Sequence, residues 1–411
     1  MSESVAFEEE IARRPDEVEP RLVFADWLEE RGDPRGEFIR LQCEREAEDT
    51  PLERELEIDA RLTELLTLHE AEWTADLREI GIDAYEFRRG FIERVAMNTP
   101  AFLETDEELF AKLPTLRSLA LKKAGPQIQE LVQRSSLRQL TTLSLQKNDL
   151  DNEQVFWIGR CRYFRTLRRL DLSVNKISNP GIASLAGSAL LDSLESLDLS
   201  HNVISADGIR RFAEAPHFGR LKELALRGNL IKARGLDALA RSETLVSLTE
   251  LDVSGNHING SEVRPVATAE GFPNLRFLDL SDNSLRPVGI ALLAGAPCFR
   301  GLVGLALRKN GALDRGTFDL CADRAVWKLQ RLDLSSNYVQ DEGLAALVRS
   351  RLKTHLRFVN LSGNSIGDRS VPGLLETSDW AKLRRIDLRE NLFSPTAAAQ
   401  LREKLGDRIA V

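Results

Sequence analysis

The residues of this chain that could support nucleophilic, redox or metal chemistry are few and far apart. Cysteine and histidine act as metal ligands when they recur at short, fixed spacings, and a thiolate is a nucleophile where its pKa is lowered. The chain has no CxxC pair, no HExxH, and neither of the phosphate-binding motifs GxxxxGKS/T and GxGxxG. We therefore expect no metal, no cofactor and no enzymatic activity. The cysteines and histidines are Cys43, Cys161, Cys298, Cys321, His69, His201, His217, His257 and His355.

The composition is that of a globular chain. Apolar residues make up 42% and charged residues 29% of its 411 residues, and no stretch approaches the ~20 apolar residues that cross a bilayer. The first residues, MSESVAFEEEIARRPDE, are acidic where a secretory signal is basic and then apolar. The cysteines are too scattered for a disulfide framework. Together these features predict a cytoplasmic protein that does not enter a membrane.

Charge is divided unevenly along the chain. Residues 1–112 contain 32 Asp and Glu against 14 Lys and Arg, a net charge of −18. Residues 113–411 contain 32 against 42, a net charge of +10, and the two sums give the overall −8. Parts of opposite sign attract each other, and they can also divide acidic and basic partners between them.

An asparagine recurs every 27 residues over more than half of the chain. Ten identical residues on an unbroken period indicate a stacked array of structural repeats. Most of the asparagines are preceded by leucines in the pattern LxxLxLxxN, in which valine or isoleucine replaces one leucine in a few repeats, and apolar residues at i, i+3 and i+4 after the asparagine mark one face of a helix. The ten residues are Asn148, Asn175, Asn202, Asn229, Asn256, Asn283, Asn310, Asn337, Asn364 and Asn391.

The pattern predicts a strand and a helix in each repeat. In Leu170-Asp171-Leu172 the period-two alternation buries both leucines and turns Asp171 outward, as in a β-strand. Strands of successive repeats are expected to pair in parallel, and the stack curves because a helix is wider than a strand. The buried asparagine can hydrogen-bond backbone groups that the turn leaves unpaired, and losing such bonds would cost about 1–3 kcal/mol per site.

LxxLxLxxN is the signature of leucine-rich repeats, which this chain resembles, and repeats of 27 residues with a helix are similar to the ribonuclease-inhibitor-like subtype. The resemblance implies an α/β fold, a curved solenoid with parallel strands inside and helices outside, behind an N-terminal α-helical domain. We predict the solenoid at residues 84–411. Two degenerate capping repeats at 84–139 are followed by ten 27-residue repeats at 140–391 and a C-terminal cap at 392–411, with twelve strands in all.

Residues 1–83 are predicted to form an acidic helical head, with helices near 4–13, 17–31, 36–48 and 52–79. The segment EPRLVFADWLEERGDPRGEFIRLQ resembles the bacterial repeat-companion domain, a short module that precedes repeat arrays. The resemblance covers about the first 45 residues; it implies a bacterial source and a place ahead of the repeats, but no activity. The aromatic residues of the head form either a small core packed on the first repeat or a separate partner-binding module.

Two further resemblances bear on activity. Cys321-Ala322-Asp323 is similar to the CxD element of leucine-rich-repeat ubiquitin ligases from pathogens, but Cys321 falls on a buried helix position and the chain shows no helical ligase domain. Leucine-rich-repeat activators of small GTPases share this repeat subtype. A GTPase regulator that acts through an outward arginine is therefore the alternative function, on analogy of fold alone.

The outward residues of the strands predict a contact surface on the concave side. An outward phenylalanine beside carboxylates fits an interaction hot spot better than an isolated charge does, and it suits a partner protein with a basic segment. Such a surface repels phosphates, so nucleic acid is not expected there. Alternatively, the aspartates that recur between the two apolar strand residues, such as Asp252 and Asp279, are a property of this repeat type. Serine and arginine side chains beside them then offset their mutual repulsion. The predicted partner-binding residues are Phe277, Asp252, Asp279, Glu223, Glu250, Phe358 and Arg331.

The basic excess of the repeats must lie mostly outside the concave side. Five arginines between residues 160 and 169 surround Tyr163 and Phe164. Solvated convex positions or attraction to the acidic head explain them, and binding of an acidic polymer or nucleic acid by this outer surface is a third function. We predict a non-enzymatic scaffold for protein–protein interaction that binds its partner on the concave face, and the sequence leaves its oligomeric state open.

Overall fold

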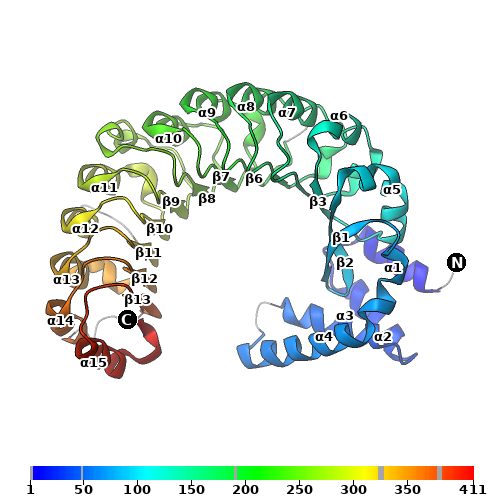
Figure 1. Cartoon of the computed structure of the whole chain (residues 1–411), viewed down its shortest axis with the longest axis horizontal. Coiled ribbons are helices and arrows are strands. Elements are labelled where there is room, and N and C mark those ends of the chain that lie inside the picture. Colours follow the sequence, from blue (N-terminus) through cyan, green and yellow to red (C-terminus); the bar gives the residue numbers. More distant parts are fainter. Residues whose placement is uncertain (1–2, 48–49, 189–191, 323–327, 377–381) are drawn as a thin grey trace. The chain divides into compact units, whose positions relative to one another are not determined.

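The structure of the chain is a computed structural model in which short strands alternate with helices and turns (Figure 1). Close contacts group the residues into two compact units. The first unit comprises residues 1–149 and 160–171, and the second unit comprises residues 150–159 and 172–411. The residues that the structure describes are 3–47, 50–188, 192–322, 328–376 and 382–411.

The strands of each unit pair in chain order. In the second unit the strands are parallel, and β6 to β13 are three residues long each. Their register follows the 27-residue repeat, so that Glu223, Glu250 and Phe277 lie side by side. The middle residues Leu224 and Leu251 are buried, as alternation in a strand requires. The strands are β1 (Ile82–Arg88), β2 (Phe91–Asn98), β3 (Ser118–Lys122), β4 (Thr142–Ser144), β5 (Arg169–Asp171), β6 (Ser196–Asp198), β7 (Glu223–Ala225), β8 (Glu250–Asp252), β9 (Phe277–Asp279), β10 (Gly304–Ala306), β11 (Arg331–Asp333), β12 (Phe358–Asn360), β13 (Arg385–Asp387) and β14 (Ile409–Ala410).

The described residues hold fourteen strands, two more than the twelve predicted. β1 pairs antiparallel with β2 through a tight turn at Arg89 and Gly90, whose φ angles are 48° and 87°; hairpin turns of the favoured hand need such positive values. β14 adds two residues parallel to β13. Neither strand carries the LxxLxL pattern, so a search for the repeat passes over both.

The helices of the second unit cover the outer side of its strands (Figure 1). In α9, Ile209 and Phe212 are buried, as their i, i+3 spacing predicts. Two short 3-10 turns replace the helix between β8 and β9, where Pro265 cannot donate a helical hydrogen bond. The helices are α1 (Glu3–Arg13), α2 (Glu19–Glu29), α3 (Pro34–Arg45), α4 (Leu52–Trp73), α5 (Thr99–Lys112), α6 (Ile128–Leu131), α7 (Asn152–Ile158), α8 (Asn179–Ala186), α9 (Ala206–Ala213), α10 (Lys232–Ala240), α11 (Arg286–Ala294), α12 (Leu313–Cys321), α13 (Asp341–Arg349), α14 (Val371–Glu376) and α15 (Pro395–Leu405).

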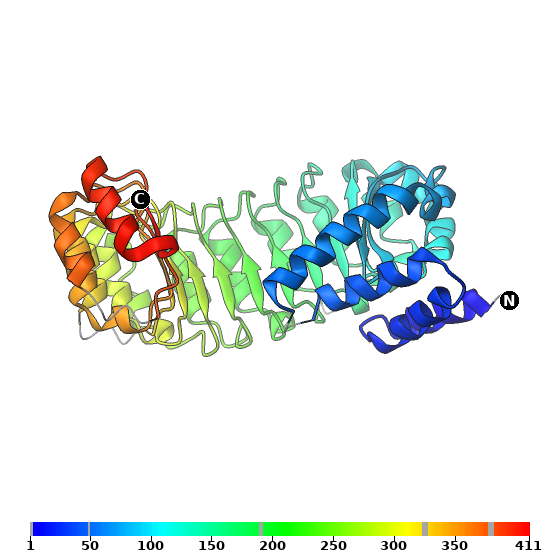
Figure 2. The same ribbon diagram turned by 90° about the horizontal axis from the view of Figure 1, so that it is seen from below.

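The fold is the predicted α/β curved solenoid with helices at its N-terminal end. Figure 2 shows the strands of the second unit, in green and yellow, side by side and pointing the same way. They line the inner side of the curve and the helices line the outer side (Figure 1). Outward-pointing strand residues of this unit therefore share one concave surface.

The repeating asparagines hydrogen-bond the backbone between repeats. The side chain of Asn283 accepts from the amides of Asn256 (3.0 Å) and Ile258 (2.9 Å) through Oδ1. Its Nδ2 donates to the carbonyls of Val253 and Leu280, at 3.2 and 2.9 Å. One side chain thus satisfies groups on two consecutive repeats that have no strand partner, which holds neighbouring turns in register.

The helices of the head differ from the prediction at their ends. α3 begins at Pro34, not at residue 36, because the Asp33 side chain accepts from the amide of Arg35 and caps the helix there. α4 ends at Trp73, six residues before the predicted end at 79, and a short 3-10 turn at Ala75–Leu77 follows it. The predicted end lies too far along the chain because no proline or glycine follows Trp73 directly, and without such a residue a sequence pattern does not locate the end of a helix closely.

Within the first unit the head packs on the β1–β2 hairpin. The ring of Phe24 in α2 stacks on Phe91 of β2 with centroids 6.0 Å apart. The fully buried Arg21 forms an ion pair with Glu93 of β2, and the amide of Gly90 donates to the side chain of Gln42 in α3 at 2.6 Å. The aromatic residues of the head therefore include a core that joins it to the first strands.

Candidate functional site

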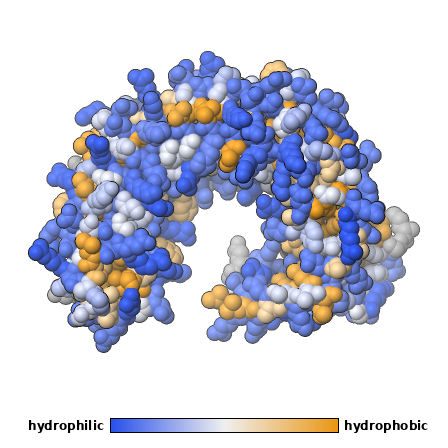
Figure 3. All heavy atoms as spheres, in the orientation of Figure 1, coloured by the Kyte–Doolittle hydropathy of each residue, from blue (hydrophilic) through white to orange (hydrophobic). Residues whose placement is uncertain are grey.

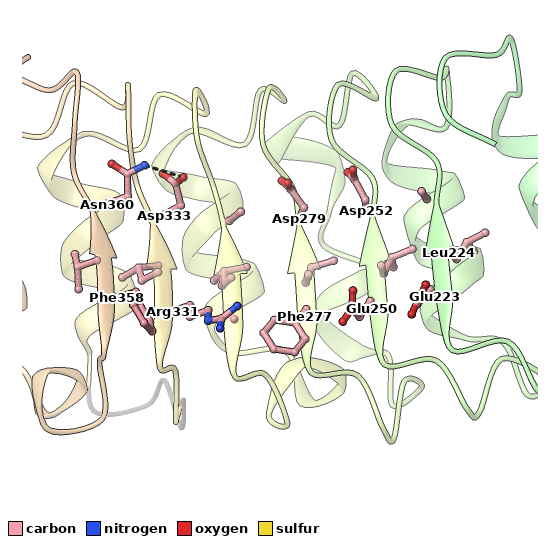
Figure 4. Close-up of a pocket in the computed structure, with 18 of the residues that line it drawn as sticks. Glu223, Leu224, Glu250, Asp252, Phe277, Asp279, Arg331, Asp333, Phe358 and Asn360 are labelled. Carbon is pink, nitrogen blue, oxygen red and sulfur yellow. Dashed lines mark hydrogen bonds between the residues drawn. The ribbon is translucent and has the colours of Figure 1, made fainter. Parts of the chain in front are cut away.

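The concave side of the second unit carries a hollow of about 670 Å³, lined by strands β6 to β13 (Figure 4). Because side chains alternate along each strand, the first and third residues face this hollow and form two rows. All seven predicted partner-binding residues line it. The first row is Ser196, Glu223, Glu250, Phe277, Gly304, Arg331, Phe358 and Arg385, and the second row is Asp198, Ala225, Asp252, Asp279, Ala306, Asp333, Asn360 and Asp387.

The carboxylates of the second row serve the turns that follow their own strands. Asp252 accepts from the amide two residues later, that of Ser254, at 2.8 Å. Asp333 accepts from both the amide and the hydroxyl of Ser335, at 2.8 and 2.6 Å, and from the side chain of Asn360 at 3.0 Å. Such bonds from an aspartate to its own chain stabilise a turn. These hydrogen bonds give the aspartates of the second row a structural role in the turns that follow them.

Asp279 is the second-row carboxylate most affected by its surroundings. Burial raises the pKa of Asp279 above its ordinary value, because a partly enclosed carboxylate is poorly solvated. Hydrogen bonds from Ser281 lower the pKa, whereas the charges of Asp252 and Asp333 raise it further. The net direction is upward, so ionisation of Asp279 costs the folded state free energy at neutral pH.

Two glutamates begin the acidic part of the first row. Glu223 and Glu250 are register partners on neighbouring strands, which lie ~4.8 Å apart in a sheet. Both carboxylates stand on the hollow side of their strands in Figure 4, in the row that also holds Phe277. Glu250 is exposed and Glu223 is half-buried. Two like charges at this spacing favour a cation between them.

The other half of the first row is an aromatic and cationic cluster. The guanidinium of Arg331 lies 5.8 Å from the centre of the Phe277 ring and 5.4 Å from that of Phe358. Both distances are typical of cation–π contacts. Phe358 stays 37% exposed and Phe277 is half-buried. The structure thus brings together three predicted residues from three different repeats.

Gly304 allows this cluster to form, and sequence reasoning gave it no function. It stands on β10 between Phe277 on β9 and Arg331 on β11. A Cβ atom at Gly304 would lie 2.5 Å from Cδ1 of Phe277, so any larger residue would displace the ring. The signal in the sequence is that a glycine interrupts a row whose other members all carry side chains.

Cys43, Cys161 and Cys298 are buried like core residues, whereas Cys321 is half-buried rather than buried as its helix position predicts. Burial raises the pKa of the thiols of Cys43, Cys161 and Cys321 to about 11 and that of Cys298 to about 12. At neutral pH they remain protonated, and a protonated thiol is a poor nucleophile. Cys321 ends α12. The aspartate of its CxD element, Asp323, lies outside the described residues.

Among the described residues, no three His, Cys, Asp or Glu side chains are placed to hold a metal ion together. In the same part of the chain, no helix combines the length and the apolar character that crossing a membrane requires.

The arginine cluster of residues 160–169 follows α7. Its arginines are exposed, whereas Phe164 between them is 1% exposed and belongs to the core. Arg162 stacks on the neighbouring Tyr163 at 4.9 Å and donates to its hydroxyl at 2.6 Å. The aromatic residues here are therefore held by packing and by a local contact.

Comparison with known proteins identifies the repeats. The sequence matches the family described as Leucine Rich repeat in six segments, and no curated protein matches the chain. The six segments are residues 165–186, 192–213, 244–261, 273–294, 328–348 and 353–371.

Among the solved structures that align with the chain are three leaving between 29% and 32% of it uncovered. A chain of the TLR13–ssRNA13 complex has a TM-score of 0.40 and 18% identity, and the alignment covers 68% of this chain and 40% of that one. An internalin from Listeria monocytogenes has a TM-score of 0.38 and 16% identity, with 70% and 94% covered. A chain of the Rad7–Elc1 complex of yeast has a TM-score of 0.48 and 15% identity, with 71% and 75% covered. The chain thus spans less than half of the TLR13 chain.

Proposed function

Since the chain carries leucine-rich repeats, we propose that it is a non-enzymatic scaffold that binds another protein on the concave face of its second unit. The observation that carries the proposal is the aromatic pair Phe277 and Phe358, which stays partly exposed in the hollow beside charged groups. Aromatic side chains in a hollow that a partner can desolvate are the usual centres of protein interfaces.

The form of the surface favours binding. Paired strands and the asparagine bonds between repeats hold the first row in place, so little ordering would oppose association. Elsewhere the visible surface is mostly hydrophilic with small apolar patches (Figure 3). Outer apolar side chains such as Val288 and Phe318 are exposed on separate helices. The hollow therefore offers the better-organised contact surface.

The acidic half of the hollow favours a basic partner. Glu223 and Glu250 stand in one row, with Asp252 and Asp279 beside them in the second. A lysine or arginine side chain of the partner would reduce the mutual repulsion of these carboxylates. The phosphates of nucleic acid would increase that repulsion, so we propose a protein partner for this face.

Replacing Phe277 tests the proposal. We expect Phe277→Ala to lower the affinity for a partner captured from the native cell at least ~10-fold, which corresponds to about 1.4 kcal/mol. The affinity of wild type and variant is measured by calorimetry, and circular dichroism checks that the repeats remain folded. The matched control is Phe318→Ala, which removes an exposed phenylalanine from α12 on the outer side. Unchanged affinity in a folded Phe277→Ala variant would contradict the proposal.

The alternative of a small-GTPase activator receives no support from Arg331 or Arg389, two outward arginines of the repeats. Such a residue must reach a nucleotide and stabilise charge there. Arg331 is stacked against two rings, and Arg389 forms an ion pair with Asp387. Stimulated GTP hydrolysis that depends on one outward arginine would revive this alternative. Binding of an acidic polymer by the arginines of residues 160–169 would appear as a steep salt dependence.

We also propose the finer assignments made from the sequence. Repeats of 27 residues with outer helices support the ribonuclease-inhibitor-like subtype. The ADWL and GDPR motifs of residues 25–35 support a repeat-companion domain and a bacterial source. Four cysteines without disulfides support a reducing, cytoplasmic location.

A further inference from the structure

The first row changes its charge from one end to the other. Glu223 and Glu250 occupy β7 and β8, and Arg331 and Arg385 occupy β11 and β13. Phe277 lies between the two pairs, with its ring toward Arg331. We call these five residues the bipolar strip. Figure 4 shows the glutamates at one side of Phe277 and Arg331 at the other.

We propose that the bipolar strip recognises an extended polypeptide segment with a basic side chain at one end, an apolar side chain in the middle and an acidic side chain at the other end. This inference rests on the proposed function, because it assumes a protein partner on the concave face. It adds that a basic segment alone is not sufficient, and that the charge order of the segment fixes the direction in which it lies across the strands.

Arg331 is well placed to receive a carboxylate. Its guanidinium lies over the rings of both Phe277 and Phe358, and within the described residues it forms no ion pair with a carboxylate. A guanidinium stacked on rings still presents the N–H groups along its edge, which match a carboxylate with two parallel hydrogen bonds. Stacking also fixes the side chain in advance, so less conformational entropy is lost on binding.

Near the cationic end of the first row, the carboxylates of the second row bind partners other than Arg331. Asp333 already accepts from the amide and hydroxyl of Ser335 and from Asn360, and Asp387 is paired with Arg389. In Figure 4 the labelled second-row side chains Asp333 and Asn360 lie along the opposite end of the strands from Arg331. Along the first row, the charge of the side chains therefore changes from negative at Glu250 to positive at Arg331.

The spacing of the charges sets the length of the segment. Glu250 and Arg331 are three strands apart, which is roughly 14 Å at ~4.8 Å per strand. An extended chain rises about 3.3 Å per residue. The basic and acidic side chains of the partner should therefore stand about four residues apart, with an aromatic or aliphatic residue between them.

Three synthetic peptides of twelve residues test the inference by fluorescence anisotropy with the full chain. The mixed peptide has two lysines, a spacer of three residues with phenylalanine in the middle, and two glutamates, so that the inner lysine and the inner glutamate stand four residues apart and on the same side as the phenylalanine. The basic peptide has lysines at both ends, and the acidic peptide has glutamates at both ends. We expect wild type to bind the mixed peptide at least ~10-fold more tightly than either of the others.

Charge reversal should change this preference in a defined way. Arg331→Glu with Arg385→Glu should make the basic peptide the preferred ligand, and Glu223→Lys with Glu250→Lys should make the acidic peptide preferred. The matched control, Glu243→Lys with Arg300→Glu, reverses exposed charges outside both rows and should keep the wild-type preference. Because each double variant is expected to gain a ligand, loss of folding cannot imitate the result.

Two outcomes would overturn the inference. If wild type prefers the basic peptide, or binds all three alike, the cationic end takes no part in recognition, although the proposed function would stand. If no peptide binds, the strip does not recognise an extended segment, and the Phe277→Ala measurement with the captured partner then decides the proposed function separately.

Discussion

At the scale of single residues, position within a strand decides what an acidic side chain does. The third residue of each strand is followed by a turn, and a carboxylate there can accept the amide two residues later, as Asp252 does from Ser254. The first residue has no such turn after it, so Glu250 faces the hollow without that partner. The predicted acidic patch therefore contains two kinds of carboxylate, of which the first-row glutamates are the better candidates for binding.

The raised pKa of Asp279 predicts the pH dependence of one variant. Ionised Asp279 costs the folded state free energy because burial leaves its carboxylate poorly solvated, so Asp279→Asn should stabilise the protein at pH 7. Since the folded-state pKa lies above the unfolded one, wild type gains stability as pH falls. The difference should shrink as pH falls through the folded-state pKa and vanish below about pH 3.9. Urea unfolding at several pH values measures it.

Asp387 is the matched control with the opposite sign. Hydrogen bonds from Arg389 lower the pKa of Asp387, so its charge stabilises the folded state above the unfolded pKa. Asp387→Asn should therefore destabilise the protein at pH 7, and the loss should disappear as pH falls through the lowered pKa. The same sign for both variants would contradict the environments assigned to these two carboxylates.

At the scale of elements, the head is joined to the first strands by a close backbone contact. Gly90 in the β1–β2 turn has a φ of +87°, and a Cβ atom there would lie 2.1 Å from Cγ1 of Ile39 in α3. Only glycine permits both the backbone conformation and this approach. The hairpin and α3 therefore form one packed element pair, although the sequence places them in different predicted domains.

Replacing this glycine should loosen the head. Gly90→Ala forces α3 away from the hairpin, and we expect a loss of more than about 2 kcal/mol together with faster proteolysis of the head. Gly32→Ala is the control, because Gly32 has a φ of +72° but nothing within 4 Å of its Cβ position. It should cost only the backbone strain of about 1 kcal/mol. Equal effects of the two substitutions would show that the contact with Ile39 contributes nothing.

At the scale of the whole molecule, a stack of repeats needs its ends covered. In the second unit, α15 and the short strand β14 lie against the last repeat, and β14 pairs with β13. Leu401 of α15 is fully buried. Terminal elements of this kind shield the apolar side of the last repeat, which would otherwise promote association.

Substitutions at two leucines test whether α15 caps the last repeat. Leu401→Ser should cost about 2–5 kcal/mol of cap stability and promote self-association, because the apolar side of the last repeat becomes accessible. Leu392→Ser replaces a leucine that is 69% exposed and should change stability by less than about 0.5 kcal/mol. Hydrogen exchange in the last repeat and size-exclusion chromatography are the measurements. A monomeric Leu401→Ser variant with unchanged exchange would contradict a capping role for α15.

The sequence by itself determined the repeat, the fold class and the side of each strand that faces the hollow. These follow from local periodicity, because a period of 27 residues fixes the register and a period of two fixes which side chains point outward. The tertiary structure alone decided three features. β1 and β14 depend on pairing with distant segments, and the second-row hydrogen bonds depend on turn geometry. The contact of Arg331 with Phe277 and Phe358 depends on side-chain rotamers and on the space over Gly304. Neither can be predicted from the spacing of residue types in the sequence.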